Sequence, residues 1–316
     1  MFFLATLRLL AAPKSTSLSR EANTALIKFK GEIMIGIIDI GGGMRGVYTS
    51  GIYDYLIDNN VKIDYCLGVS SGSGNLINYV AGQKGRCKKF YTDYAFDSDY
   101  MGVTALLKSG DFMNVDYIYS GICNTGGKDP LDYEALMKSD IRFTCVATDS
   151  KTAKPHYFTK EDFAQDNYEV LKAACALPLA CRPVKIGDRK FYDGGVSDPI
   201  PIRKAFADGC DKVIVCITLP RDHRKDKIHW AANILLANHP RILNNILIMH
   251  HFYNNGISEL LELEAEGKVL VVDPEECFGV NTIKRDKEGM EKLYQLGYRD
   301  GKRIEDFVNA VKTESK

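Results

Sequence analysis

The chain has 316 residues, of which 45% are hydrophobic and 26% are charged, and it contains 41 Lys+Arg and 41 Asp+Glu residues. This length and composition fit one large α/β domain or two small ones, and they exclude a disordered protein, a collagen-like fibre and a small disulfide scaffold. A net charge of zero lacks the basic excess typical of nucleic-acid-binding chains, so we expect no nucleic-acid partner.

The nine cysteines are scattered, odd in number and without a C-x-x-C pair, so we expect free, buried thiols in a cytoplasmic protein. No group of residues has the spacing of metal ligands, and neither a metal nor a cofactor is expected. No apolar run approaches the roughly 20 residues that a membrane-spanning helix needs.

Residues 1–33 differ from the rest of the chain. The apolar run 2–12 is interrupted by Arg8 and lacks a preceding basic region, so it makes a poor signal peptide, while a transit peptide stays open. Lys30-Gly31-Glu32 can be encoded by a stretch that contains a bacterial ribosome-binding site, shortly before Met34. We therefore hypothesise that translation starts at Met34 and that residues 1–33 lie outside the fold. The remaining chain, 34–316, is slightly acidic, which favours apolar over electrostatic contact with lipid.

From residue 34 on, strands and helices alternate, which predicts one domain built on a parallel sheet with helices on both faces. Strands are expected at 34–40, 61–69, 141–148, 184–192 (a pair about the Gly187-Asp188 turn), 212–219 and 268–272. Helices are expected from residue 47 to Asn59-Asn60, from 75–81 onward, and at 160–174, 228–254, 256–266 and 287–312.

The first glycine-marked site is Gly41-Gly42-Gly43-Met44-Arg45-Gly46, between the first strand and its helix. It satisfies the G-x-G-x-x-G fingerprint of dinucleotide-binding folds. Its backbone N–H groups suit a pyrophosphate or a developing oxyanion equally well. The next strand, however, ends in Gly68-Val69-Ser70 and not in the acidic residue that a ribose needs. Arg45, at the positive end of a helix, hints at an anionic partner.

The second site is Gly68-Val69-Ser70-Ser71-Gly72, again between a strand and a helix. This is G-x-S-x-G in the strand–turn–helix context of a nucleophile elbow. Glycines two positions either side make room for a strained turn at Ser70, whose hydroxyl then lies at a helix N-terminus. Ser71 and Ser73 lack glycines at both positions and are the weaker candidates. A plain turn is the competing interpretation.

The third site is Asp193-Gly194-Gly195, at the end of a predicted strand. An Asp-Gly pair is most often only a turn. None of the six histidines lies at a glycine-marked strand end, as the histidine of a Ser–Asp–His triad would be expected to; His223, for example, lies in a charged loop. A Ser–Asp dyad is therefore the better arrangement than a triad.

Together the three sites resemble the patatin-like phospholipase family in order, spacing and context: its glycine-rich oxyanion segment, its nucleophile elbow and its Asp-Gly-Gly/Ala motif. Ala176-Leu177-Pro178 and Thr148-Asp149 also fit. The resemblance runs from about Met34 to the C-terminus and is strongest for bacterial single-domain members. One departure is Asp39-Ile40 before the glycines, where many members carry an acidic residue and glycine.

The resemblance implies an α/β, three-layer α/β/α fold with a mainly parallel central sheet. It also implies a serine lipid acyl hydrolase, phospholipase A-like or lysophospholipase-like, that uses a Ser–Asp dyad without a catalytic histidine or metal. Carried over, Ser70 is the nucleophile and Asp193 the proton acceptor. The remaining roles carried over are the oxyanion segment (Gly41, Gly42, Gly43, Met44, Arg45, Gly46, with donors from Gly42, Gly43 and Met44), the elbow (Gly68, Val69, Ser71, Gly72) and the Asp-Gly-Gly motif (Gly194, Gly195). Its partner would be a lipid or fatty-acyl ester, with peripheral membrane contact.

Three competing functions stay open: an esterase of small molecules or acyl thioesters, a nucleotide-binding oxidoreductase that uses residues 41–46, and a catalytically silent lipid-binding relative. The apolar segment 228–254 is interpreted either as a core helix pair or as a lid or acyl groove. Head group, acyl length and oligomeric state are not encoded in any motif that we recognise.

Overall fold

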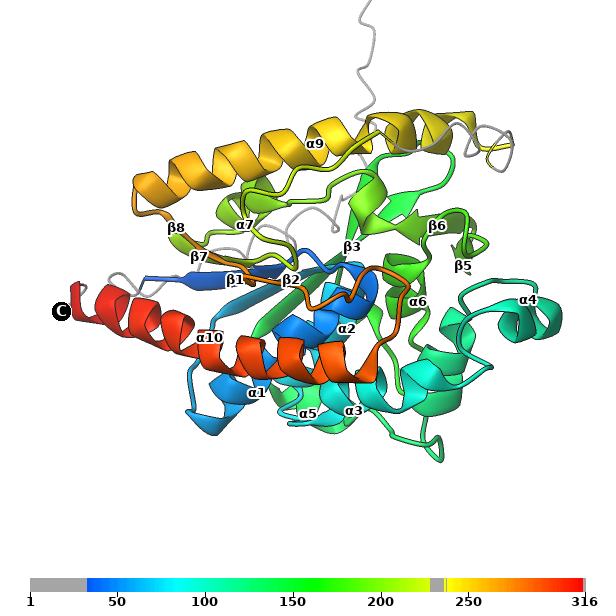
Figure 1. The fold of residues 1–316 in the computed structure, drawn as a ribbon, viewed down its shortest axis with the longest axis horizontal. Coiled ribbons are helices and arrows are strands. Elements are labelled where there is room, and N and C mark those ends of the chain that lie inside the picture. The colour runs from blue at the N-terminus through cyan, green and yellow to red at the C-terminus, as the bar shows by residue number, and fades with distance from the viewer. Residues whose placement is uncertain (1–32, 228–235, 237, 315–316) are drawn as a thin grey trace, which may run out of the picture. The chain divides into compact units, whose positions relative to one another are not determined.

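A computed structural model describes residues 33–227, 236 and 238–314, so the hypothesis on residues 1–33 lies outside the described chain except at Ile33. Its centre is an eight-stranded sheet in the order β5-β6-β3-β2-β1-β7-β8, with β4 paired to β3 off this path (Figure 1). The strands are β1 Ile35–Asp39, β2 Tyr65–Val69, β3 Arg142–Asp149, β4 Pro155–Thr159, β5 Val184–Ile186, β6 Arg189–Asp193, β7 Lys212–Cys216 and β8 Val269–Val272. The five strands from β3 to β8 along this order are parallel, and β4, β5 and β6 pair antiparallel.

Helices cover both faces of the sheet, as Figure 1 shows, with α7 and α9 on one side and α1, α2, α3 and α10 on the other. The helices are α1 Val47–Asp58, α2 Ser71–Val80, α3 Arg86–Thr92, α4 Val103–Ser109, α5 Tyr133–Lys138, α6 Glu169–Cys175, α7 Ile202–Ala207, α9 Pro240–Ala265 and α10 Lys287–Glu314. Successive residues of β1 face opposite layers: Ile37 packs in the core shared with α1 and α10, and Ile38 in the core shared with α7 and α9. The expected three-layer α/β/α fold with a mainly parallel sheet is confirmed.

Two expected elements are wrong in their bounds. The strand expected at 61–69 begins only at Tyr65, because Val61 still bonds back to the end of α1 and Asp64 receives the N–H of Ile35. The helix expected at 160–174 is a single 3₁₀ turn, closed by a capping box between Thr159 and Asp162, and helix α6 begins only at Glu169.

The two C-terminal helices expected at 228–254 and 256–266 form one helix, α9, over their described part. Gly256, the first residue of the second expected helix, lies inside this single helix against the side chain of Ile200, so tertiary packing overrides the weak helix propensity of glycine. Residues 228–235 and 237 lie outside the described chain. Helices α3, α4 and α5, which fill the region 82–140, are short, and no sequence pattern predicts them.

Helix α10 lies against α1 at backbone contact distance, and two glycines make this possible. A Cβ at Gly297 would overlap the carbonyl of Tyr48, and a Cβ at Gly51 would overlap the carbonyl of Tyr294. Hydrogen bonds from Tyr48 to Asp300 (2.8 Å) and from Tyr294 to Asp54 (2.8 Å) join the same two helices. The C-terminal helix is therefore packed as tightly as any element nearer the N-terminus.

We expect Gly297→Ala to lower the free energy of unfolding by about 1–3 kcal/mol or more, because the added methyl group meets backbone that cannot rotate away. Chemical denaturation of the full chain measures this loss. Gly121→Ala is the matched control, since its Cβ would find its nearest neighbour at 3.9 Å. Equal stability of the two variants would contradict the close helix contact.

Candidate active site

Ser70 occupies a strained turn between β2 and α2. Its backbone has φ 54° and ψ −136°, in the region that residues with a Cβ rarely adopt. Gly68 and Gly72 allow this turn, because a Cβ at Gly68 would overlap the backbone of Ser73 and one at Gly72 would overlap Asp39. The strand–turn–helix context expected of a nucleophile elbow is present, and Ser70 is the N-cap residue of α2.

The glycine segment folds over this elbow, and its backbone donors are unequally available. The N–H of Gly41 donates to Asp39 (2.8 Å), that of Gly42 to the hydroxyl of Ser71 (3.1 Å), and that of Met44 to the carbonyl of Thr282 (3.2 Å). Among the described residues, the Gly43 N–H has no acceptor. The N–H groups of Gly42 and Met44, both expected as oxyanion donors, therefore have partners in this conformation, and their role as donors stays a prediction.

Asp39, to which the sequence patterns give no role, and Ser71, a residue of the predicted elbow, hold this segment. Asp39 is fully buried, and it accepts hydrogen bonds from the Gly41 N–H and from the hydroxyl of Tyr53 (3.0 Å). Burial raises the pKa of Asp39 to about 6, against the effect of these hydrogen bonds. Ser71, by its spacing only a weaker nucleophile candidate, receives the Gly42 N–H and so joins the elbow to the glycine segment.

Asp193 ends β6 and is buried beside the same turn. Its Oδ1 accepts the N–H of Gly195 (2.8 Å), whereas its Oδ2 has no hydrogen-bond partner. Burial raises the pKa of Asp193 to about 6, and the nearby Ser70 hydroxyl, the Gly195 amide and the Lys225 ammonium act against this rise. A buried carboxylate with one open oxygen and a raised pKa is suited to accept a proton.

A cavity of about 350 Å³ brings Ser70, Asp193 and the glycine segment together. Its remaining wall is mostly apolar and includes Val196 and Pro199 after β6, Leu219 after β7, and four further groups of residues. The four groups are Met101, Phe112 and Met113 around α4, Leu177, Pro178, Leu179 and Ala180 after α6, Ile246, Met249 and Tyr253 on α9, and Thr282 and Ile283 before α10. The described part of α9 therefore packs in the core and also forms a wall of the cavity. It combines features of the two interpretations of segment 228–254, a core helix pair and an acyl groove.

Two cationic side chains face the same cavity. Arg45, which the glycine motif contains, is buried and its Nε has no hydrogen-bond partner. Lys225 comes from the loop after β7, and its Nζ lies 3.9 Å from the centroid of the Tyr253 ring. Hydrogen bonds in both directions between its backbone and Asn254 (2.9 and 3.0 Å) hold it there. Burial and repulsion by Arg45 lower the pKa of Lys225 to about 8.

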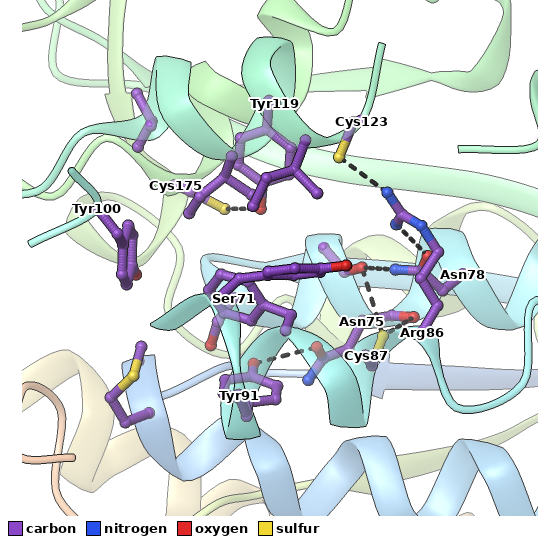
Figure 2. Close-up of a pocket in the computed structure, with 18 of the residues that line it drawn as sticks. Ser71, Asn75, Asn78, Arg86, Cys87, Tyr91, Tyr100, Tyr119, Cys123 and Cys175 are labelled. Atoms are coloured by element: carbon purple, nitrogen blue, oxygen red, sulfur yellow. Dashed lines mark hydrogen bonds between the residues drawn. The ribbon is translucent and has the colours of Figure 1, made fainter. Parts of the chain in front are cut away.

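A second, narrower cavity of about 80 Å³ begins on the other side of the nucleophile and shares Gly43, Ser70 and Met113 with the first. It is lined mainly by aromatic and sulfur side chains. Figure 2 shows Tyr100 toward one end and Arg86 with Asn78 and Cys123 at the other. There the guanidinium of Arg86 donates to Asn78 Oδ1 (2.5 Å), Cys123 Sγ (3.1 Å) and the carbonyl of Asp129 (2.5 Å), which holds it in place.

No histidine of the described residues lines either cavity: His156, His223, His239, His250 and His251 all lie elsewhere, and His229 falls outside the described chain. All nine cysteines are unpaired. Across the residues that the structure describes, no helix has the length and apolarity to cross a bilayer.

Comparison with known proteins agrees with this geometry. Residues 41–206, just over half of the chain, match the family described as patatin-like phospholipase. The chain belongs to the patatin-like phospholipase family. The match spans the glycine segment, the elbow at Ser70 and the Asp193 turn. Membership in this family supports lipid acyl hydrolysis as the general activity.

The C-terminal part matches separately, over residues 239–311, a domain of unknown function (DUF6363). This matched segment contains α9, β8 and most of α10, and it supplies Ile246, Met249, Tyr253, Thr282 and Ile283 to the wall of the larger cavity. The segment of unknown function is therefore part of the same site.

Two individual proteins are similar to this chain. An uncharacterized protein of Escherichia coli, YjjU, is 27% identical over 193 residues, which cover 59% of this chain and 52% of YjjU. This chain thus matches about half the length of that relative. The crystal structure of VipD from Legionella pneumophila superposes with a TM-score of 0.50 and 13% identity, over 88% of this chain and 67% of VipD. The likeness to VipD concerns the fold.

We expect Lys225→Met to move the acid limb of the pH–rate profile upward by roughly one pH unit. The Lys225 ammonium lowers the pKa of Asp193, so its loss lets that pKa rise further above 6, and the carboxylate then forms only at higher pH. The measurement is kcat/KM against pH on a water-soluble short-chain ester. Lys225→Arg, which keeps the charge, should leave the limb in place, and an unmoved limb in Lys225→Met would contradict the coupling.

Proposed function

We propose that the chain is a serine lipid acyl hydrolase that cleaves carboxylic esters of lipids, phospholipase A-like or lysophospholipase-like, with Ser70 and Asp193 as a catalytic dyad. The observation that carries the proposal is the pairing, in one apolar cavity, of a serine held in a strained elbow with a buried carboxylate whose Oδ2 has no partner. No histidine takes part, and neither a metal nor a cofactor is required by this chemistry.

The reaction follows from these two groups. Ser70 Oγ attacks the ester carbonyl while its proton passes to Asp193 Oδ2, since a carboxylate is too weak a base to deprotonate a free hydroxyl beforehand. The raised pKa of Asp193 brings it nearer to that of a useful base. Asp193 then gives the proton to the leaving alcohol, and a water molecule repeats the sequence on the acyl-serine.

The oxyanion needs donors that are free when it forms. Gly43 offers an N–H without an acceptor among the described residues, and Gly42 offers one that Ser71 holds at 3.1 Å. The positive end of α2 and the guanidinium of Arg45 add to the stabilisation of negative charge. A single donor of this kind contributes about 3–4 kcal/mol to the transition state. The role of Arg45 is to hold this segment or the substrate beside it.

Two apolar cavities that meet at Ser70 support a lipid over a small ester. An ester with short groups on both sides would leave much of the roughly 350 Å³ cavity unfilled, whereas a lipid places an acyl chain and the remainder of the molecule on two sides of the carbonyl. The narrow cavity, lined mainly by aromatic and sulfur side chains, suits the acyl chain. The runner-up, an esterase of small molecules or acyl thioesters, uses the same dyad without this need for length.

The site gives little support to a nucleotide-binding oxidoreductase or to a catalytically silent lipid-binding protein. A pyrophosphate needs several open N–H groups at the glycine segment, but those of Gly41, Gly42 and Met44 already bond within the chain, which disfavours the oxidoreductase. A silent lipid-binding protein has no need of a strained serine beside an open carboxylate oxygen. We therefore propose a lipid ester as the partner, while a cytoplasmic location and peripheral membrane contact stay predictions from the sequence.

We expect a fluorophosphonate probe to label the chain at Ser70, and Ser70→Ala to abolish the label, because among the serines that the structure describes only Ser70 has a strained backbone. Ser73→Ala and Ser71→Ala should keep the label, since each leaves Ser70 in place. Gel fluorescence after labelling, with mass spectrometry of the modified peptide, is the measurement. Undiminished label in a folded Ser70→Ala variant would refute the assignment.

The dyad has its own test in hydrolysis. Asp193→Asn should keep the fold and lower kcat by about 10²–10⁴, since the amide cannot accept the serine proton. His223→Ala should keep its activity, because His223 lies outside both cavities. A well-folded His223→Ala variant without turnover would favour a triad. The wild-type rate should rise with pH through about 6, as Asp193 ionises.

Filling the narrow cavity should change the acyl preference. Ile118 lines it from the π-helix Tyr117–Ile122, and Ile118→Phe adds volume there. We expect the ratio of long-chain to short-chain ester hydrolysis to fall by about tenfold, with kcat on the shortest ester retained, as measured on a series of p-nitrophenyl esters. A parallel loss on all chain lengths would contradict the placement of the acyl chain.

A further inference from the structure

The large hydrophobic side chains exposed on the described chain are not scattered. Five of the six lie in three segments: Val103, Leu106 and Leu107 on α4, Leu179 after α6, and Ile283 before α10. Leu107 is 81% exposed and Val103 69%. The sixth, Phe252, lies on α9. Single exposed apolar residues are ordinary, but five in three segments that themselves line the Ser70 cavity, or directly adjoin residues that line it, mark an interaction surface. We call these five residues the apolar rim.

The apolar rim is continuous with the cavity that contains Ser70. Leu179 and Ile283 line that cavity and are also exposed. Met101 and Phe112, which flank α4 in the chain, line it as well. The Gly102 N–H donates to the Phe112 carbonyl (2.9 Å), so the two ends of the α4 segment meet at the mouth of the cavity.

Helix α4 is held firmly while one side of it stays uncovered. Ala105 is fully buried, and Arg182 donates to the carbonyl of Ser109 (2.5 Å) and to Asp111 Oδ1 (3.1 Å), which ties the end of α4 to the loop that carries Leu179. Figure 1 shows α4 at the edge of the domain, beyond α6 and β5 and away from the central sheet. The exposure of Leu106 and Leu107 therefore belongs to a fixed surface.

The charged side chains Lys108 and Arg182 beside α4 are paired, whereas Lys284, next to Ile283, is exposed. Lys108 bonds to Asp99 (2.5 Å) and Arg182 to Asp111 (3.1 Å), so the α4 segment offers no spare positive charge to an acidic surface. The α4 surface, with apolar side chains and internally paired charges, matches an uncharged or zwitterionic lipid surface. A protein partner seated on the same residues would cover the opening through which substrate reaches Ser70.

We propose that the apolar rim, led by Val103, Leu106 and Leu107 of α4, is the surface by which this protein docks on a zwitterionic or neutral lipid aggregate, with the mouth of the cavity facing the lipid. The proposal rests on the proposed function, since it takes the docked surface to be the source of substrate. Lipid then passes from the aggregate along Leu179 and Ile283 into the cavity without crossing water.

The test separates docking from hydrolysis. Full-length Ser70→Ala protein, which binds without turnover, is co-sedimented with phosphatidylcholine vesicles. We expect Leu106→Ser/Leu107→Ser in this background to weaken vesicle binding by about tenfold or more, because the apolar area that enters the lipid is lost. Binding should change little when salt is raised and should not require an anionic lipid. Phe252→Ser, which removes the exposed aromatic outside the rim, is the matched control and should bind as before.

In the catalytically intact chain, the same double substitution should lower hydrolysis of vesicle lipid by a similar factor and leave kcat/KM on a soluble short-chain ester unchanged. Undiminished vesicle binding by the double variant would overturn the docking surface, as would binding that appears only with anionic lipid or is lost in high salt. Loss of binding together with formation of a stable complex between copies of the chain through α4 would also overturn it. If vesicles bind through the rim while neither the soluble nor the vesicle ester is hydrolysed by the intact chain, the proposed function fails and the docking surface stands.

Discussion

The site depends on the close approach of two loops at the carboxyl ends of β1 and β2. These strands are neighbours in the parallel sheet, so the glycine segment and the elbow leave it side by side. Asp39 lies at their junction, where it receives the Gly41 N–H and backs onto Gly72 without a Cβ between them. The Gly42 N–H donates to the Ser71 hydroxyl and so links the glycine segment directly to the elbow. The buried carboxylate of Asp39 and the absence of a Cβ at Gly72 therefore fix the position of Ser70 relative to the backbone amides of the glycine segment.

Ionisation in this region is governed by burial. Asp39 and Asp193 are both buried, and burial raises the pKa of each to about 6, but their surroundings differ. Asp39 is occupied by hydrogen bonds to the glycine segment and to Tyr53, which suits a structural role. Asp193 keeps one buried oxygen without a hydrogen-bond partner, with Lys225 as a nearby cation. The two carboxylates have a similar pKa but suit different roles, because Asp39 is occupied by hydrogen bonds whereas Asp193 Oδ2 accepts none.

Local patterns predict the parts of the site that are local. The turn at Ser70 needs glycine two residues before and after it, so Gly68 and Gly72 indicate it from sequence alone, and the sheet with its two helical layers follows from the alternation of apolar runs. The contributions of Lys225, Tyr253 and Thr282 come from segments far from the motifs, and no spacing rule connects them to Ser70. Thr282 occupies the Met44 N–H, which the family motif assigns to the oxyanion. Helix α4 is not predicted from the sequence, because it is only about two turns long and its apolar residues do not recur at the spacing that places one helix face in a core.

The pairing of β1 with β7, and of β7 with β8, determines which part of the chain can be treated as an independent folding unit. The family match ends at residue 206, before either β7 or β8 begins. A piece of the chain cut there would leave β1 as an unprotected sheet edge and Ile38 and Leu67 without the layer that covers them. Such a fragment would be prone to aggregate through that edge. The unit that evolution can exchange, and that an engineer can transplant, is therefore the whole sheet with α9 and α10, even though sequence comparison divides it in two.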